Sequence, residues 1–125
     1  MDLDFFNYKK YNIEVETIKE RILSILADLN LSGYIGIEFV STEKIKKLNK
    51  KYRNINESTD VLSFSTKTLK KNQIFGEITI CPEYAKKEKI EIIDLVIHGL
   101  IHLLGYDHKT KTDIKKWDEV LIKFK

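Results

Sequence analysis

The segment from Ile90 to Leu104, IEIIDLVIHGLIHLL, limits the possible folds more than any other part of the sequence. Its apolar residues follow a helical period but cover nearly every direction around the axis, so the rest of the protein must enclose this helix. The chain has 125 residues, of which 42% are hydrophobic, and this suffices for one small domain with a real core. We therefore expect the 90–104 helix to be central and mostly buried.

The polar side chains of this segment fall on one stripe. Asp94, His98 and His102 are spaced four residues apart, so they share one side of the helix. The chain has three histidines, and the third, His108, follows Gly105. A glycine in the left-handed conformation ends a helix and reverses the chain, which would bring His108 back to the same place. The three histidines are therefore candidate ligands of one metal ion.

Three imidazoles on one side of a metal leave a fourth position free for water, which is the open arrangement of catalytic zinc sites. Two other interpretations remain open. The histidines could be separate core residues, with Asp94 and Asp107 supplying hydrogen-bond acceptors. They could also belong to a closed structural zinc site, which needs a fourth ligand such as Cys81. Three histidines would suit nickel or cobalt as well as zinc.

The residue after the first histidine distinguishes this segment from a metalloprotease. The spacing H-x3-H-x5-H is that of the pattern H-E-x-x-H-x-x-G-x-x-H, in which Glu is the general base. Gly99 stands in place of that Glu and has no side chain that accepts a proton. It either permits close helix packing or lets a bulky substrate approach the metal. A metal would still activate a bound water, so the pattern argues against proteolysis but not against hydrolysis.

The remaining patterns predict a single layered α+β domain spanning residues 1–125. We expect about four strands in a mixed sheet packed with helices, in the rough order βαβαββαα, with the metal site on the central buried helix. The expected strands are 3–8, 34–40, 60–65 and 74–80, the expected helices are 15–30, 41–53, 90–104 and 112–124, and a helical or irregular passage begins at Pro82.

Composition and charge limit the possible partners of the protein and the cellular compartment in which it works. The net charge of +3 permits an anionic partner without arguing for one. The single cysteine cannot form an internal disulfide, which fits a reducing compartment. The N-terminus MDLDFFNYKKYN has no basic region followed by an apolar run, and the longest apolar segment is too short to span a bilayer. We expect a soluble cytoplasmic protein with no membrane partner.

Three blocks of the sequence stand out: HGLIHLLGYDH at 98–108, LNKKYRNINESTDVLSFS at 48–65 and GEITI at 76–80. Together they resemble the YbeY family of bacterial rRNA maturation endoribonucleases. HGLIHLLGYDH, at 98–108, is similar to the family signature H-G-x-x-H-x-x-G-Y-D-H. LNKKYRNINESTDVLSFS, at 48–65, is similar to L-N-x-x-Y-R followed by T-D-V-L-S-F, and GEITI, at 76–80, to the family's G-[DE]-I strand. The blocks occur in the family's order. Ser65 departs from a proline common in the family, and the tail 109–125 is more basic than usual.

The resemblance implies a metal-dependent endoribonuclease that prefers single strands and acts in rRNA processing (small-subunit rRNA 3′ end maturation) and ribosome quality control. It implies that His98, His102 and His108 hold one zinc ion per chain, and that Arg53 is a catalytic and substrate-binding residue near the metal. RNA cleavage develops negative charge on the phosphate, which a guanidinium fork can bind at two oxygens. A structural ion pair of Arg53 with Glu57 or Asp60 is the alternative.

Other residues of these blocks each have more than one candidate role. Asp107 is a second catalytic candidate: it could orient a ligand imidazole, assist proton transfer or cap a turn. Thr59 and Asp60 could fix the loop before a strand or have a catalytic role, and Glu77 could reach the cleft. The implied partners are rRNA, the small ribosomal subunit and ribosome-assembly proteins. Two other functions stay open: a zincin-like metallohydrolase or protease, and a non-catalytic ribosome-assembly factor with a structural zinc.

Overall fold

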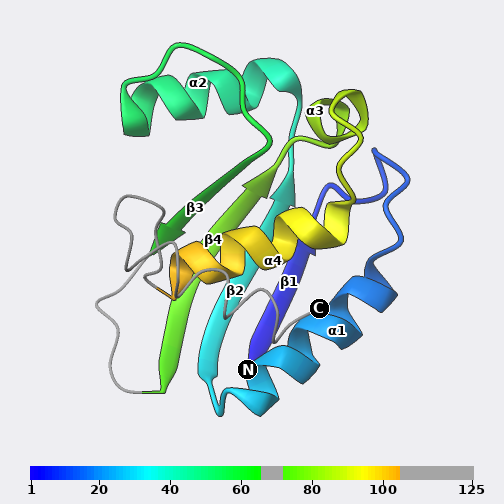
Figure 1. Ribbon diagram of the computed structural model, residues 1–125, viewed down its shortest axis with the longest axis vertical. Coiled ribbons are helices and arrows are strands. Elements are labelled where there is room, and N and C mark those ends of the chain that lie inside the picture. The colour runs from blue at the N-terminus through cyan, green and yellow to red at the C-terminus, as the bar shows by residue number, and fades with distance from the viewer. Residues whose placement is uncertain (66–71, 105–125) are drawn as a thin grey trace.

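The computed structural model describes residues 1–65 and 72–104. Its four strands form one mixed sheet in the order β1-β2-β4-β3, in which β1, β2 and β4 are parallel and β3 is antiparallel to β4. The elements are β1 (Asp2–Phe6), α1 (Val15–Asp28), β2 (Ser32–Phe39), α2 (Thr42–Arg53), β3 (Val61–Ser65), β4 (Gln73–Ile80), α3 (Pro82–Lys87) and α4 (Ile92–Leu103). This architecture confirms the predicted α+β class and the four-stranded mixed sheet (Figure 1).

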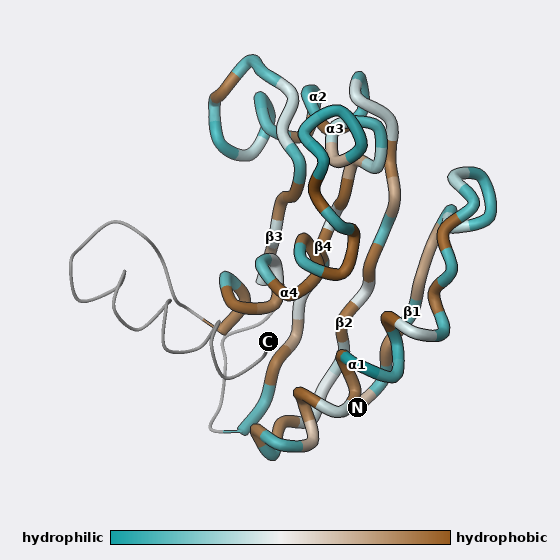
Figure 2. The backbone as a smooth tube through the Cα atoms, turned by 45° about the vertical axis from the view of Figure 1, so that its right-hand side comes forward, coloured by the Kyte–Doolittle hydropathy of each residue, from teal (hydrophilic) through white to brown (hydrophobic). Residues whose placement is uncertain are grey.

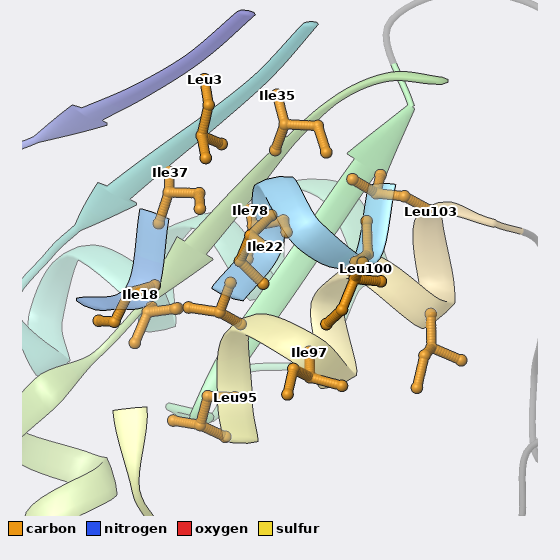
Figure 3. Packing of buried hydrophobic residues seen from close by; sticks show 14 of the residues in the cluster. Leu3, Ile18, Ile22, Ile35, Ile37, Ile78, Leu95, Ile97, Leu100 and Leu103 are labelled. Atoms are coloured by element: carbon orange, nitrogen blue, oxygen red, sulfur yellow. The ribbon is translucent and has the colours of Figure 1, made fainter. Parts of the chain in front are cut away.

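Helix α4 is enclosed, as its composition predicts. Seven of its twelve residues are buried. Together with α1 it covers one face of the sheet, and side chains from both helices and from the strands meet in a common core (Figures 1 and 3). Ile22 of α1, Ile78 of β4 and Leu100 of α4 belong to this core and are each at most 1% exposed. Each such side chain contributes about 1.5–3 kcal/mol on burial, so the core holds α4 firmly against the sheet.

Helix α2 packs on the other face of β3. Leu62 and Phe64 of β3 contact the apolar side of α2, where Ile45 is fully buried. Successive strand side chains point to opposite faces, so Ser63, between these two residues, points toward α4. The N-terminus of α2 is capped by Ser41, whose hydroxyl accepts a hydrogen bond from the backbone N–H of Lys44 at 3.2 Å. Strand β3 therefore connects the surroundings of α2 with those of α4.

The observed element ends differ from the expected ones by up to two residues, and left-handed turns account for several of these differences. Strand β1 stops at Phe6 because Asn7 has a φ of 65°. Lys89, with a φ of 57°, closes the chain after α3, and the N–H of Ile90 donates back to the carbonyl of Ala85 at 2.9 Å. Helix α4 consequently begins at Ile92 rather than at Ile90.

Four further expectations concern Pro82, the helix 112–124, Gly105 and the absence of a membrane-spanning segment. Pro82 begins a short helix, α3, with the proline in its first turn. The expected helix 112–124 and the helix-ending role of Gly105 lie outside the described residues. None of the helices in the described part of the chain is long and apolar enough to cross a membrane.

Candidate functional site

Helix α4 presents His98 and His102 on the same side. Their ring centroids lie 4.9 Å apart with 64° between the ring planes. Both residues are half-buried, whereas Asp94, one turn earlier, is exposed. Two imidazoles bound at about 2 Å to one tetrahedral zinc ion would have their ring centroids about 5 Å apart. The predicted stripe therefore forms, and the spacing of the pair fits two ligands of one ion.

The rest of the predicted metal site is only partly described. His108 and Asp107 lie outside the described residues, so the third ligand and the role of Asp107 remain predictions. Within residues 1–65 and 72–104, no group of three His, Cys, Asp or Glu side chains could hold a metal ion. Cys81 is fully buried in the cluster that contains Leu62, on the α2 side of β3. This position gives no support to Cys81 as a fourth ligand beside the histidine pair.

Gly99 lies where α4 touches the sheet. A Cβ atom at this position would lie 2.7 Å from Cγ2 of Ile78 and 3.0 Å from Oγ of Ser63. Real Cβ atoms essentially never come as close as the first distance, so glycine at 99 is required for close helix packing. Of the two interpretations of this glycine, the structure supports packing. It also gives a physical reason why the protease glutamate is missing, since a side chain here would point into β3 and β4.

Ser63 is a supporting residue that the sequence patterns did not single out. Its hydroxyl donates a hydrogen bond of 3.0 Å to the backbone carbonyl of Gly99, next to the first histidine. This bond joins β3 to the helix that carries the histidine pair. The alternation of Ser63 with Leu62 and Phe64 was a usable signal, because it separates Ser63 from the apolar face of its strand. Only the contacts of Gly99 with Ser63 and Ile78 show that α4 lies on that side.

Arg53 is the last residue of α2, and its side chain is exposed. The helix ends at Asn54, whose φ of 58° is left-handed and whose N–H donates to the carbonyls of Asn49 and Lys50. The ring of Tyr52 contacts the ring of Phe64 on β3, with 5.0 Å between centroids. Arg53 thus leaves α2 beside β3, the strand against which α4 also packs.

The loop that follows Arg53 is held by local hydrogen bonds. Asn49, 4% exposed, donates from its side-chain amide to the carbonyl of Glu57 at 2.9 Å. The carboxylate of Asp60 accepts from the N–H of Val61 at 2.8 Å and from the hydroxyl of Thr59 at 3.3 Å. These contacts assign Thr59 and Asp60 to turn chemistry. Asn49 was not among the residues predicted from the sequence. It lies four positions after Ile45, and a polar residue on the buried side of a helix is a signal of a buried hydrogen bond.

Glu77 does not reach the histidine pair. Its neighbour Gly76 faces α4, because a Cβ there would meet the side chain of Leu103, so Glu77 points to the opposite face of the sheet. There its charge acts on Tyr34. Burial is the main cause that raises the pKa of the Tyr34 hydroxyl, followed by the nearby Asp4, with Glu77 adding to the effect.

The family model described as Endoribonuclease YbeY matches residues 5–121. The chain belongs to this family. A YbeY relative from Acholeplasma laidlawii, named Endoribonuclease YbeY, is 34% identical over 125 residues, which cover 93% of this chain and 88% of the relative. A relative of the same name from Finegoldia magna is 39% identical over 102 residues, which cover 73% of this chain and 67% of the relative.

A solved structure supports the fold of this YbeY family member. The solution structure of TM1509 from Thermotoga maritima matches with a TM-score of 0.59 and 28% sequence identity. The match covers 99% of this chain and 89% of that one.

Proposed function

We propose that this chain is a metal-dependent endoribonuclease that hydrolyses phosphodiester bonds of RNA, with a preference for single strands. Its role would be rRNA processing, including maturation of the 3′ end of small-subunit rRNA, and ribosome quality control in the cytoplasm. The observation that carries the proposal is the half-buried pair of His98 and His102, 4.9 Å apart, in a chain of the YbeY family. The partners would be rRNA, the small ribosomal subunit and ribosome-assembly proteins.

The donor set fits zinc. His98 and His102 present two imidazole nitrogens from one helix face, and His108 would supply a third. When bound, the metal would supply an activated water or polarise a phosphoryl oxygen. Gly99 has no proton-accepting group, so the general base must come from another residue.

Arg53 would bind the scissile phosphate. Its guanidinium is exposed at the end of α2, and the neighbouring Asp60 carboxylate is engaged by the N–H of Val61 and the hydroxyl of Thr59. A guanidinium binds two phosphate oxygens at once, and it stabilises the negative charge that develops there. Asp107 would orient a ligand imidazole or assist proton transfer.

The test combines metal analysis with mapping of rRNA ends in cells that carry each variant. We expect His98→Ala to lose both the metal and rRNA maturation. We expect Arg53→Ala to keep the fold and the metal but to lose about 10²- to 10³-fold in cleavage rate, because a donor to the developing charge is removed. Arg21→Ala, which changes the only other arginine, on α1, is the matched control and should mature rRNA normally.

Two outcomes would contradict the proposal. If Arg53→Ala matures rRNA like the wild type while His98→Ala loses metal and stability, the protein is an assembly factor with a structural zinc. If the purified protein cuts peptides in a zinc-dependent way but leaves RNA intact, it is a metalloprotease. The His98→Ala protein, purified in parallel, shows whether a contaminating nuclease causes any cleavage.

A further inference from the structure

Helix α2 has the highest net positive charge of the four described helices. It carries six basic residues and one Glu within its twelve residues, a net charge of +5. The whole chain carries +3, so everything outside α2 has a net charge of −2. The six basic residues, all exposed, are Lys44, Lys46, Lys47, Lys50, Lys51 and Arg53. The modest net charge of the chain therefore conceals one strongly basic helix.

These charges lie on the side of α2 that faces away from the protein. Ile45 and Asn49 are buried against the loop and β3, and the lysines occupy the opposite half of the helix. Lys46 and Lys50 are four residues apart, as are Lys47 and Lys51. Like charges at this spacing repel one another and weaken an isolated helix, whereas a polyanion laid along the helix would reverse that effect.

An exposed aromatic ring lies in the last turn of α2, at the edge where the helix meets β3. Tyr52 is 56% exposed although its ring contacts Phe64 of β3. The ammonium group of Lys51 lies 5.1 Å from the centroid of the Tyr52 ring. An exposed aromatic ring that packs against the protein and has a cation close to it is the kind of surface on which unpaired bases stack in proteins that bind single strands.

We propose that the outer face of α2 is the surface that binds single-stranded RNA. Its lysines contact consecutive phosphates, and Tyr52 stacks on an unpaired base next to Arg53. The inference rests on the proposed function for the choice of RNA, and it adds where the strand runs and why unpaired RNA is preferred. An anionic membrane is a less suitable partner, because the apolar side of α2 is already packed against the protein. Figure 2 shows hydrophilic residues around α2 and α3 at this end of the molecule.

The test is fluorescence anisotropy with labelled oligouridylate about twelve nucleotides long, whose integrity is checked on a gel after each titration. The charge variant Lys46→Gln, Lys47→Gln, Lys50→Gln should bind about tenfold more weakly at low salt. The slope of log K against log salt should become less negative by about 2, for three lost contacts on a single strand. The matched control removes three lysines on and after α3, with Lys86→Gln, Lys87→Gln, Lys89→Gln, and should bind within about twofold of the wild type.

Substitution of Tyr52 separates stacking from packing. Tyr52→Leu keeps apolar contact with Phe64 but removes the flat ring, so binding of the oligouridylate should weaken about tenfold. Tyr52→Phe should bind like the wild type, and neither change should alter binding of a duplex RNA. Circular dichroism and thermal unfolding establish that each variant is folded.

Each outcome supports or overturns the proposal that the outer face of α2 binds single-stranded RNA. The proposal would be overturned if the α2 and α3 charge variants lost affinity for the oligouridylate equally. It would also be overturned if both variants bound the oligouridylate as tightly as the wild type. Wild-type protein that binds phosphatidylserine vesicles but no RNA would also overturn it, in favour of a membrane. If the wild type binds RNA through α2 but never cleaves it, the surface stands and the proposed endoribonuclease activity fails.

Discussion

Position 99 is where the packing of α4 and the chemistry of the histidine pair meet. The backbone carbonyl of Gly99 accepts the Ser63 hydroxyl, and its Cα lies against Ile78 without space for a methyl group. His98, the preceding residue, takes its position from the same contact. A change at residue 99 therefore affects stability first and the histidines second.

We expect Gly99→Ala to lower the free energy of unfolding, measured by urea denaturation. Overpacking costs about 1–3 kcal/mol, whereas the gain in helix propensity from Gly to Ala is about 1 kcal/mol at most. Gly36→Ala is the matched control, because the nearest atom to its added Cβ is the Tyr34 hydroxyl at 3.1 Å, the far end of a movable side chain. Equal destabilisation by the two changes would show that the α4 contact is not special.

At the scale of elements, the N-cap of α1 makes a pH-dependent contribution to the stability of the folded protein. Glu14 is the N-cap, and its carboxylate accepts hydrogen bonds from the N–H of Glu16 at 2.9 Å and from the N–H of Thr17 at 3.2 Å. The hydroxyl of Thr17 donates a third bond at 2.7 Å. This hydroxyl is the largest cause that lowers the pKa of Glu14 below its ordinary value of 4.5, and the two backbone bonds add to it.

A carboxylate with a lowered pKa in the folded state stabilises the protein above its unfolded pKa, and the contribution is lost as the pH falls through the folded pKa. We therefore expect Glu14→Ala to unfold at a lower temperature than the wild type near neutral pH. This difference should shrink as the pH falls below 4.5. Thr17→Ala should raise the pKa of Glu14 toward its ordinary value in an NMR titration. A difference in unfolding temperature that stays constant down to about pH 2 would contradict this assignment.

Features of the helices and strands could be predicted where they depend on residues close together in the sequence. Asp94, His98 and His102 are four residues apart, so their shared side of α4 was predicted from the sequence alone, and the structure places His98 and His102 there. The start of α4 was misplaced because Lys89 adopts a left-handed conformation that lysine rarely takes. The roles of Ser63 and Gly99 could not be predicted either, since they depend on which strand lies beneath α4.

At the scale of the whole molecule, the proposed zinc should stabilise the fold. A ligand at one hundred times its dissociation constant adds about 2.7 kcal/mol to the free energy of unfolding if it binds only the folded state. For a domain of this size we expect a rise in the melting temperature of roughly 10 °C on adding zinc to chelator-treated protein. His98→Ala should show no such rise in differential scanning calorimetry. A wild type whose melting temperature does not change with zinc would contradict a metal site at the histidines.

The arrangement of the whole sheet was beyond sequence reasoning. The four strands were expected, but nothing local places β4 between β2 and β3. That order sets Ile78 opposite both Ile37 and Ser63, and so brings the strand beneath α4 and the strand beside α2 together. The relation between the histidine pair and Arg53 is a product of this topology, since the two lie on helices separated by two strands in the sequence.

The contact beneath Gly99 also limits how such a protein can evolve. A single nucleotide change converts two of the four glycine codons to glutamate codons, and that one step would place a glutamate after His98, where the zinc peptidase pattern has its general base. In this chain the new side chain would meet Ile78 and Ser63 before it could act. A smaller residue at 78 would have to arise first, while it still carried the penalty of a cavity. The packing beneath residue 99 therefore keeps this chain from acquiring that glutamate in a single tolerated step.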